Sequence, residues 1–252
     1  MPFLVLAFDS SIAVGTNLVD CKSIVDAGVA TQSGDGYVLD SRMKLLLGAY
    51  GFGATLSRIQ VQTPRFNLLA YQEVLALNNA AAAAYEQNKL DWYGAGARAL
   101  TETETLIAQV IQTSAGAETD RVLVWLGDSV PAPIAKEHFT MRFTGSSTLT
   151  ADAWSTVSPT LDRSLPAGKY DIIGARLKTA GGIAFRVNIP GFNFRPGGIC
   201  VQTDLANDPP IQRHGGLGVW GSFEQNLLPT FDVLSTSADT SQSGELDLVK
   251  SA

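Results

Sequence analysis

Charged side chains are scarce in this chain of 252 residues, where Asp, Glu, Lys and Arg together make up 17% and the formal net charge is −6. Average soluble domains contain about 25% charged residues. The sequence has no run of lysine or arginine. Attraction to a phosphate backbone is therefore not expected to drive binding, and we expect no direct nucleic-acid partner.

Cysteine is equally scarce. The two cysteines, Cys21 and Cys200, lie in different halves of the chain. Two cysteines so far apart do not form a disulfide framework, so we predict two free, buried thiols. Free thiols are compatible with a reducing interior such as the cytoplasm.

Long hydrophobic runs are also missing. No apolar run approaches the ~18–20 residues that a membrane-spanning helix needs. The apolar start, residues 1–8, has no preceding basic region and ends at Asp9. This pattern favours a first β-strand over a secretory signal.

The residue groups that usually carry catalysis are absent as well. His138 and His214 have no histidine neighbour, whereas a two-barrel enzyme of the bicupin type needs a His-x-His pair with a following Glu. We therefore interpret both histidines as ordinary surface or loop residues. Glu102 and Glu104 could form a glycosidase pair, but a solvated strand face is the favoured interpretation. The sequence predicts no catalytic, cofactor-binding or metal-binding residues, and no cofactor.

Four tryptophans are spread over both halves of the chain. They could form a platform for stacking sugars, but core or subunit contacts are the commoner role for residues spread in this way. Their positions are Trp92, Trp125, Trp154 and Trp220.

The chain contains one internal sequence repeat of 20 residues. Residues 48–67 read GAYGFGATLSRIQVQTPRFN and residues 174–193 read GARLKTAGGIAFRVNIPGFN, without a gap and at an offset of half the chain. The identities are Gly48, Ala49, Ala54, Val61, Pro64, Phe66 and Asn67 with Gly174, Ala175, Ala180, Val187, Pro190, Phe192 and Asn193. A repeat of this kind indicates duplication of one structural unit.

The repeated stretch has the period of a β-strand. Polar and apolar residues alternate over 57–63 and 184–189, which is typical of a half-buried antiparallel strand. Pro64 and Pro190 each remove a backbone donor, so each strand should end there. The glycines before these strands predict a tight connection, so we expect the same hairpin in each half, on one sheet face.

The remaining chain predicts a domain order. Residues 1–130 form a first domain, with an inserted helix at about 68–90 where helix-forming residues contain no Gly or Pro. The stiff segment 129–133, SVPAP, is the domain boundary. Residues 131–235 form a second domain, and 236–252 a flexible tail rich in Ser, Thr and Asp.

About eight short strands per half, separated by turn signals, are typical of sandwiches and barrels. The predicted fold is all-β: two tandem eight-stranded jelly-roll β-barrels with one inserted helix in the first.

Particular sequences carry a family resemblance. They are the strand ending in Pro-x-Phe-Asn, the following FRPGG of 194–198, and GGLGVWGSF of 215–223 before a final strand that begins near Pro229. With the duplication and the size, they resemble the double jelly-roll major capsid proteins of tailless icosahedral bacteriophages.

The resemblance implies a structural protein of the virion, made in the host cytoplasm, and not an enzyme. Three chains would form a homotrimer with six barrels and a pseudo-hexagonal outline. Neighbouring trimers would then tile an icosahedral capsid that in many relatives surrounds an internal membrane. No tower domain is evident, which implies a separate vertex or penton protein for receptor binding. The alternatives are a carbohydrate-binding or spike-like β-sandwich protein and, less favoured, a two-barrel enzyme.

Overall fold

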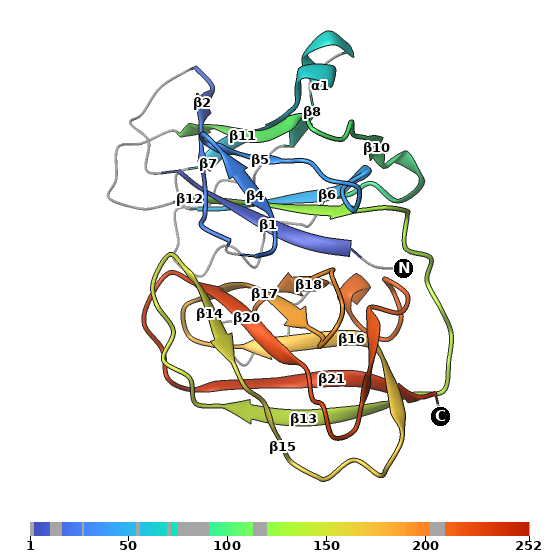
Figure 1. The fold of residues 1–252 in the computed structure, drawn as a ribbon. Coiled ribbons are helices and arrows are strands. Elements are labelled where there is room, and N and C mark those ends of the chain that lie inside the picture. Colours follow the sequence, from blue (N-terminus) through green and yellow to red (C-terminus); the bar gives the residue numbers. More distant parts are fainter. Residues whose placement is uncertain are drawn as a thin grey trace. The chain divides into compact units, whose positions relative to one another are not determined.

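The computed structural model describes residues 3–10, 17–26, 28–53, 56–69, 72–74, 91–112, 120–201 and 210–251. The protein is all-β, with four antiparallel sheets in two compact units (Figure 1). The N-terminal unit is Leu6–Val130. The C-terminal unit is Pro131–Ala252 together with Met1–Val5, so strand β1 (Phe3–Ser10) spans the division.

The N-terminal unit contains two sheets. The strands of the first are, besides β1, β3 (Lys22–Ser23), β6 (Leu45–Phe52), β9 (Asp91–Trp92), β10 (Arg98–Ala99) and β12 (Asp120–Gly127). They lie in the order β10-β6-β12-β1-β3, and β9 also pairs with β6. The strands of the second are β2 (Val19–Asp20), β4 (Thr31–Ser33), β5 (Gly36–Val38), β7 (Leu56–Gln62), β8 (Gln72–Val74) and β11 (Thr105–Gln112). Their order is β4-β5-β11-β7-β8, and β2 also pairs with β11. The described residues of this unit also form two short helices, α1 (Pro64–Leu69) and η2 (Gly94–Gly96).

The C-terminal unit also contains two sheets. The strands of the first are β13 (Phe139–Gly145), β15 (Thr160–Leu161), β16 (Lys169–Lys178), β19 (Gly221–Glu224) and β21 (Gln242–Lys250), in the order β15-β13-β21-β16-β19. Those of the second are β14 (Trp154–Val157), β17 (Gly182–Asn188), β18 (Gly197–Ile199) and β20 (Thr230–Ser235), in the order β14-β20-β17-β18. One short helix, η3 (Pro210–Gln212), precedes β19.

In each unit the two sheets face one another across an apolar core. In the N-terminal unit Phe8 of one sheet contacts Tyr37 of the other edge to face, with ring centroids 5.1 Å apart. In the C-terminal unit Phe143 stacks on Phe231 of the opposite sheet at 4.6 Å. All four rings are at most 1% exposed. Aromatic pairs that bridge two sheets in this way make each half a sandwich.

The two units share one pairing order. The first strand (β1 or β13) lies beside the last (β12 or β21), and the last lies beside the upstream strand of the repeat (β6 or β16). In the opposite sheets, the penultimate strand (β11 or β20) lies beside the downstream strand of the repeat (β7 or β17). The next strand (β8 or β18) pairs with that downstream strand. The repeated sequence therefore occupies the same structural position twice.

The sequence predicted that each copy of the repeat forms a hairpin, and this prediction is wrong. β6 and β7 belong to opposite sheets, and so do β16 and β17. Alternation shows which side chains of a strand are buried, but not which strand is its neighbour, and this explains the error. The predicted ends are confirmed, because β7 stops at Gln62 and β17 at Asn188, just before Pro64 and Pro190.

The predicted helix at about 68–90 is wrong at Gln72–Val74, while residues 68–69 are the end of a short helix. The helix α1 begins at Pro64, where a proline suits the first helical turn, and ends at Leu69. Gln72–Val74 form β8, which pairs with β7, so sheet pairing there outweighs the helical propensity of the sequence. Residues 75–90 lie outside the described residues.

The predicted flexible tail after Ser235 is wrong for residues 242–250. These residues form β21, which lies between β13 and β16 and pairs with both. Leu246 and Leu248 are buried while Glu245 and Lys250 are not. A short alternating pattern at the end of a Ser- and Thr-rich segment is thus a central strand.

Two further observations concern burial. Cys21 and Cys200 are buried and belong to no disulfide, as predicted. Burial in apolar surroundings raises the pKa of the Cys200 thiol well above its usual value. Among the described residues, we find no helix with the length and apolar character needed to cross a bilayer.

Candidate functional site

A network of polar side chains lies on the outer face of the strands β13, β21 and β16. Strand register places three rows of side chains across this face, because residues two apart on a strand point to the same side. The rows are Thr140-Asp247-Gly174, Arg142-Glu245-Arg176 and Thr144-Ser243-Lys178. On β21, Leu246 between the first two rows and Leu248 just beyond the first row are buried in the core.

Asp247 is the centre of the first row and is completely buried. Its carboxylate accepts four hydrogen bonds: 2.8 Å from Thr140 Oγ1, 2.8 and 3.0 Å from Arg213 Nε and Nη2, and 3.0 Å from the backbone N–H of His214. Burial alone would raise the pKa of Asp247, but these donors outweigh it and lower the pKa from 3.8 to about 2. Asp247 is therefore a fixed negative charge that holds the loop above it.

That loop, residues 210–218, covers the sheet and is called here the covering loop. It approaches closely because Gly174 has no side chain: a Cβ there would lie 2.7 Å from Asp247 Oδ2 and 2.9 Å from His214 N. Just before Gly174, Ile173 is the extra residue of a β-bulge opposite β21. Its carbonyl accepts a 2.7 Å hydrogen bond from Gly215 N. Bulge, glycine and carboxylate together fix the covering loop.

The covering loop brings the two histidines together. His138 Nε2 lies 3.0 Å from His214 Nδ1, and the ring centroids are 5.1 Å apart. His138 Nδ1 lies 3.0 Å from the carbonyl oxygen of Lys136, and His214 Nδ1 lies 3.5 Å from Asp247 Oδ2. His214 has φ 52°, in the left-handed region that few residues other than glycine adopt. Both rings face solvent, and the His214 side chain is 55% exposed.

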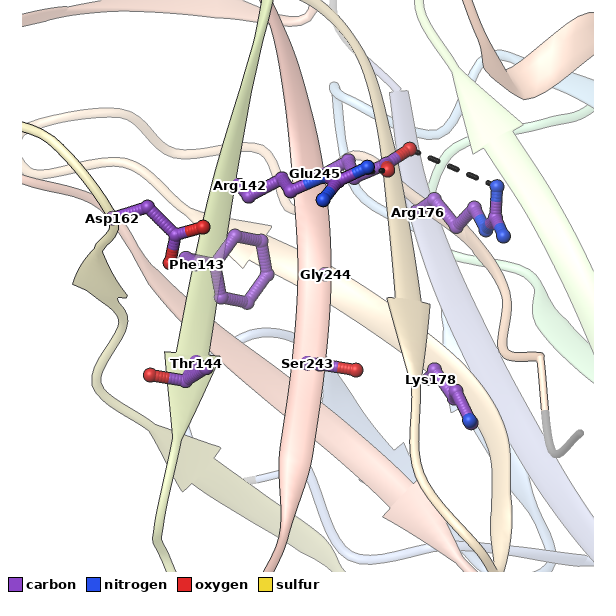
Figure 2. Close-up of a pocket in the computed structure, with 9 residues that line it drawn as sticks. All are labelled: Arg142, Phe143, Thr144, Asp162, Arg176, Lys178, Ser243, Gly244 and Glu245. Atoms are coloured by element: carbon purple, nitrogen blue, oxygen red, sulfur yellow. Dashed lines mark ion pairs between the residues drawn. The ribbon is translucent and has the colours of Figure 1, made fainter. Parts of the chain in front are cut away.

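The second row forms one wall of a hollow of about 360 Å³. Figure 2 shows three adjacent strands that carry most of its charged and hydroxyl-bearing side chains, with Glu245 on the central one, while Asp162 follows β15 at the side. Glu245 lies 3.7 Å from both Arg142 and Arg176, and 3.1 Å from Arg213. Arg142 is 75% exposed and Arg176 26%, so their ion pairs add little stability and leave charge available to a partner, whereas Arg213 is only 10% exposed.

The arrangement has clear chemical limits. Its carboxylates are held by arginines, and within the described residues of this face no Ser or Thr hydroxyl is paired with a histidine in the manner of an activated nucleophile. The side chains can present fixed charges to another protein surface, and the two imidazoles can offer lone pairs to a cation.

Sequence reasoning missed the meeting of the two histidines. They are 76 residues apart, and both belong to the C-terminal unit. The only available signal was that the chain contains just two histidines.

The other candidate residues do not form a site. Glu102 lies in a turn and not on a strand face, and Glu104 Oε2 lies 3.4 Å from the backbone N of Arg65. Trp125 and Trp220 are core residues with no exposed surface. Trp154 lies beneath the Arg186 guanidinium, 3.8 Å from its carbon.

Comparisons of the chain with protein-family models, curated proteins and solved structures found no match.

Proposed function

We propose that this chain is a structural major capsid protein, built from two jelly rolls, that forms trimers and tiles an icosahedral shell. The observation that carries the proposal is the common pairing order of the two units. In both, the first strand neighbours the last and the repeat crosses from one sheet to the other. Such non-sequential neighbours are expected of paired Greek keys and not of a meander, which supports a jelly roll in each half.

A β-bulge at the same place in each unit supports an origin of the chain by duplication. Leu47 and Ile173, the residues directly before the two copies of the repeat, are the extra residues of bulges at matching positions. Bulges are retained features of related folds, so their agreement favours descent of both units from one ancestral unit. Two similar units per chain allow three chains to present six near-equivalent sides, which is the geometric requirement for pseudo-hexagonal packing.

Charge also supports the proposal. With a net charge of −6 and only 17% charged residues, the chain offers neutral surface for subunit contacts and little attraction for nucleic acid. In this proposal the partners are other copies of the chain and a separate vertex protein, and the place of action is the virion, with or without an internal membrane.

Light scattering coupled to size-exclusion chromatography tests the proposal. Three chains of 26.7 kDa give a species of about 80 kDa, which we expect to persist on dilution. A monomer at all concentrations that binds glycans saturably would contradict the proposal and favour the carbohydrate-binding alternative.

A further inference from the structure

We propose that His138 and His214 form a binding site for one divalent transition-metal ion of the Zn²⁺, Ni²⁺ or Cu²⁺ type. The first support is the separation of their ring nitrogens, 3.0 Å. Two nitrogens bound at about 2.0–2.1 Å to one tetrahedral ion lie about 3.3 Å apart. The rings therefore need to separate by only a few tenths of an ångström to hold the ion.

The tautomer of His138 is set by its other nitrogen. Nδ1 lies 3.0 Å from the carbonyl oxygen of Lys136, which can only accept, so Nδ1 carries the proton. In the neutral ring, Nε2 then directs its lone pair toward His214 Nδ1, which donates the hydrogen of this contact. When an ion binds, the neutral His214 ring carries its proton on Nε2 instead, and Nδ1 becomes the ligand. A metal-binding histidine typically donates its second N–H to a carbonyl or carboxylate in just this way.

The backbone of His214 is held in place before any ion binds. Its left-handed φ of 52° persists because its N–H is bonded to Asp247 and the next N–H, of Gly215, is bonded to Ile173 O. Unfavourable backbone conformations survive where the surroundings over-determine them, and they concentrate at functional sites. The site therefore presents the second imidazole without further ordering of the covering loop.

Asp247 acts on this site without being a ligand. Its two oxygens already accept four hydrogen bonds, which fill the lone-pair positions of a carboxylate. Its Oδ2, 3.5 Å from His214 Nδ1, orients the loop that carries His214. Water completes the coordination of the ion, since both histidines face solvent. Two imidazoles select Zn²⁺, Ni²⁺ or Cu²⁺ over Mg²⁺ and Ca²⁺, which prefer oxygen ligands.

The ion would join two segments of the C-terminal unit. His138 ends the segment 131–138, and the same segment already bonds to the covering loop through Ile134 N and Gly215 O at 2.9 Å. A metal ion bound by both histidines would add a second link between the segment 131–138 and the covering loop, beside this hydrogen bond. We therefore expect metal binding to stabilise the C-terminal unit, whichever assembly the chain forms.

Calorimetric titration of the untagged full chain with ZnCl2 and NiCl2, after removal of metal by chelation, tests the inference. We expect one ion per chain, at least about tenfold weaker binding in H138Q and in H214N, and no binding of MgCl2. Asn is chosen at 214 because it tolerates a positive φ. E137Q, an exposed change beside His138, is the matched control and should bind like the wild type.

A second readout separates this site from the two cysteines. Co²⁺ should bind without the thiolate absorption bands that cysteine ligands produce, and Zn²⁺ should raise the Tm of the wild type and of E137Q only. Unchanged binding in H138Q and H214N would overturn the inference. So would the absence of binding by the wild type at about 1 mM metal, because the pair would then be a hydrogen bond between two imidazoles.

Discussion

Leu47 and Ile173 occupy matching positions in the two units. Each is the extra residue of a β-bulge, and each carbonyl accepts a backbone hydrogen bond: from Tyr93 N, just after β9, at 2.9 Å and from Gly215 N of the covering loop at 2.7 Å. The residue that faces the following glycine differs, being Trp125 opposite Gly48 and Asp247 opposite Gly174. The common bulge thus lies beside a buried tryptophan in one unit and beside a buried, ion-paired aspartate in the other.

Substituting Gly174 by Ala should destabilise the protein by about 1–3 kcal/mol, because the new methyl group would overlap the covering loop and Asp247. Chemical denaturation measures the effect. G96A is the matched control, since a Cβ at Gly96 meets nothing within 4 Å, and it should change stability by no more than about 0.5 kcal/mol. Equal effects of the two changes would contradict the close approach of the loop at Gly174.

Deleting residues 242–252 should abolish folding of the C-terminal unit, because it removes β21 from between β13 and β16. Circular dichroism and limited proteolysis of the purified chain would show this loss. Deletion of Ser251 and Ala252 alone is the control and should leave the unit folded. A shorter chain that still melts cooperatively at the wild-type temperature would mean that 242–250 is a dispensable tail.

Replacing Arg186 by Met should cost about 3–5 kcal/mol, since it leaves Asp232 without its cation. Arg186 is 2% exposed, with Nη2 3.3 Å from Asp232 Oδ2 and its guanidinium over the Trp154 ring. The double variant R186M/D232N removes both charges and should recover part of the loss. Additive losses in denaturant melts would indicate that the two charges do not interact.

Asp239 should make stability depend on pH. Burial raises the pKa of this carboxyl, but hydrogen bonds from Thr179 Oγ1 and from the N–H groups of Ser241 and Ala180 outweigh it and lower the pKa below 3.8. A lowered folded-state pKa gives stability that is complete above the unfolded value, about 3.9, and is lost as pH falls through the folded value.

The variant D239N isolates this contribution. It should be less stable than the wild type near neutral pH, and the difference should shrink as the pH falls below about 4. D162N, at an exposed carboxylate, is the control and should show no such convergence. A constant D239N difference across this range would contradict the assignment.

The sequence predicted what depends on local pattern. Alternation identified the strands around Ile59 and Phe185, and Pro64 and Pro190 marked where they end. The sequence could not predict which strands pair with one another, because the alternation of polar and apolar residues is the same whether β6 pairs with β7 or with β12. The strand β21 was missed since its two core leucines follow a polar segment, and local propensity failed at β8, where pairing with β7 decides the structure.

The candidate site was less predictable than the fold. Its residues come from β13, β16, β21 and the covering loop, and only the register of three strands brings Thr140, Gly174 and Asp247 into one row. Nothing near His138 in the sequence indicates that its neighbour is His214. A contact of that kind depends on topology, which one sequence does not reveal.

Electron microscopy of the purified chain tests the central claim, that two similar units per chain build a six-sided capsomer from three chains. The account predicts class averages with six lobes and threefold symmetry, and closed shells or hexagonal sheets where these particles associate. Single two-lobed particles at every concentration, or rings with another number of chains, would contradict it.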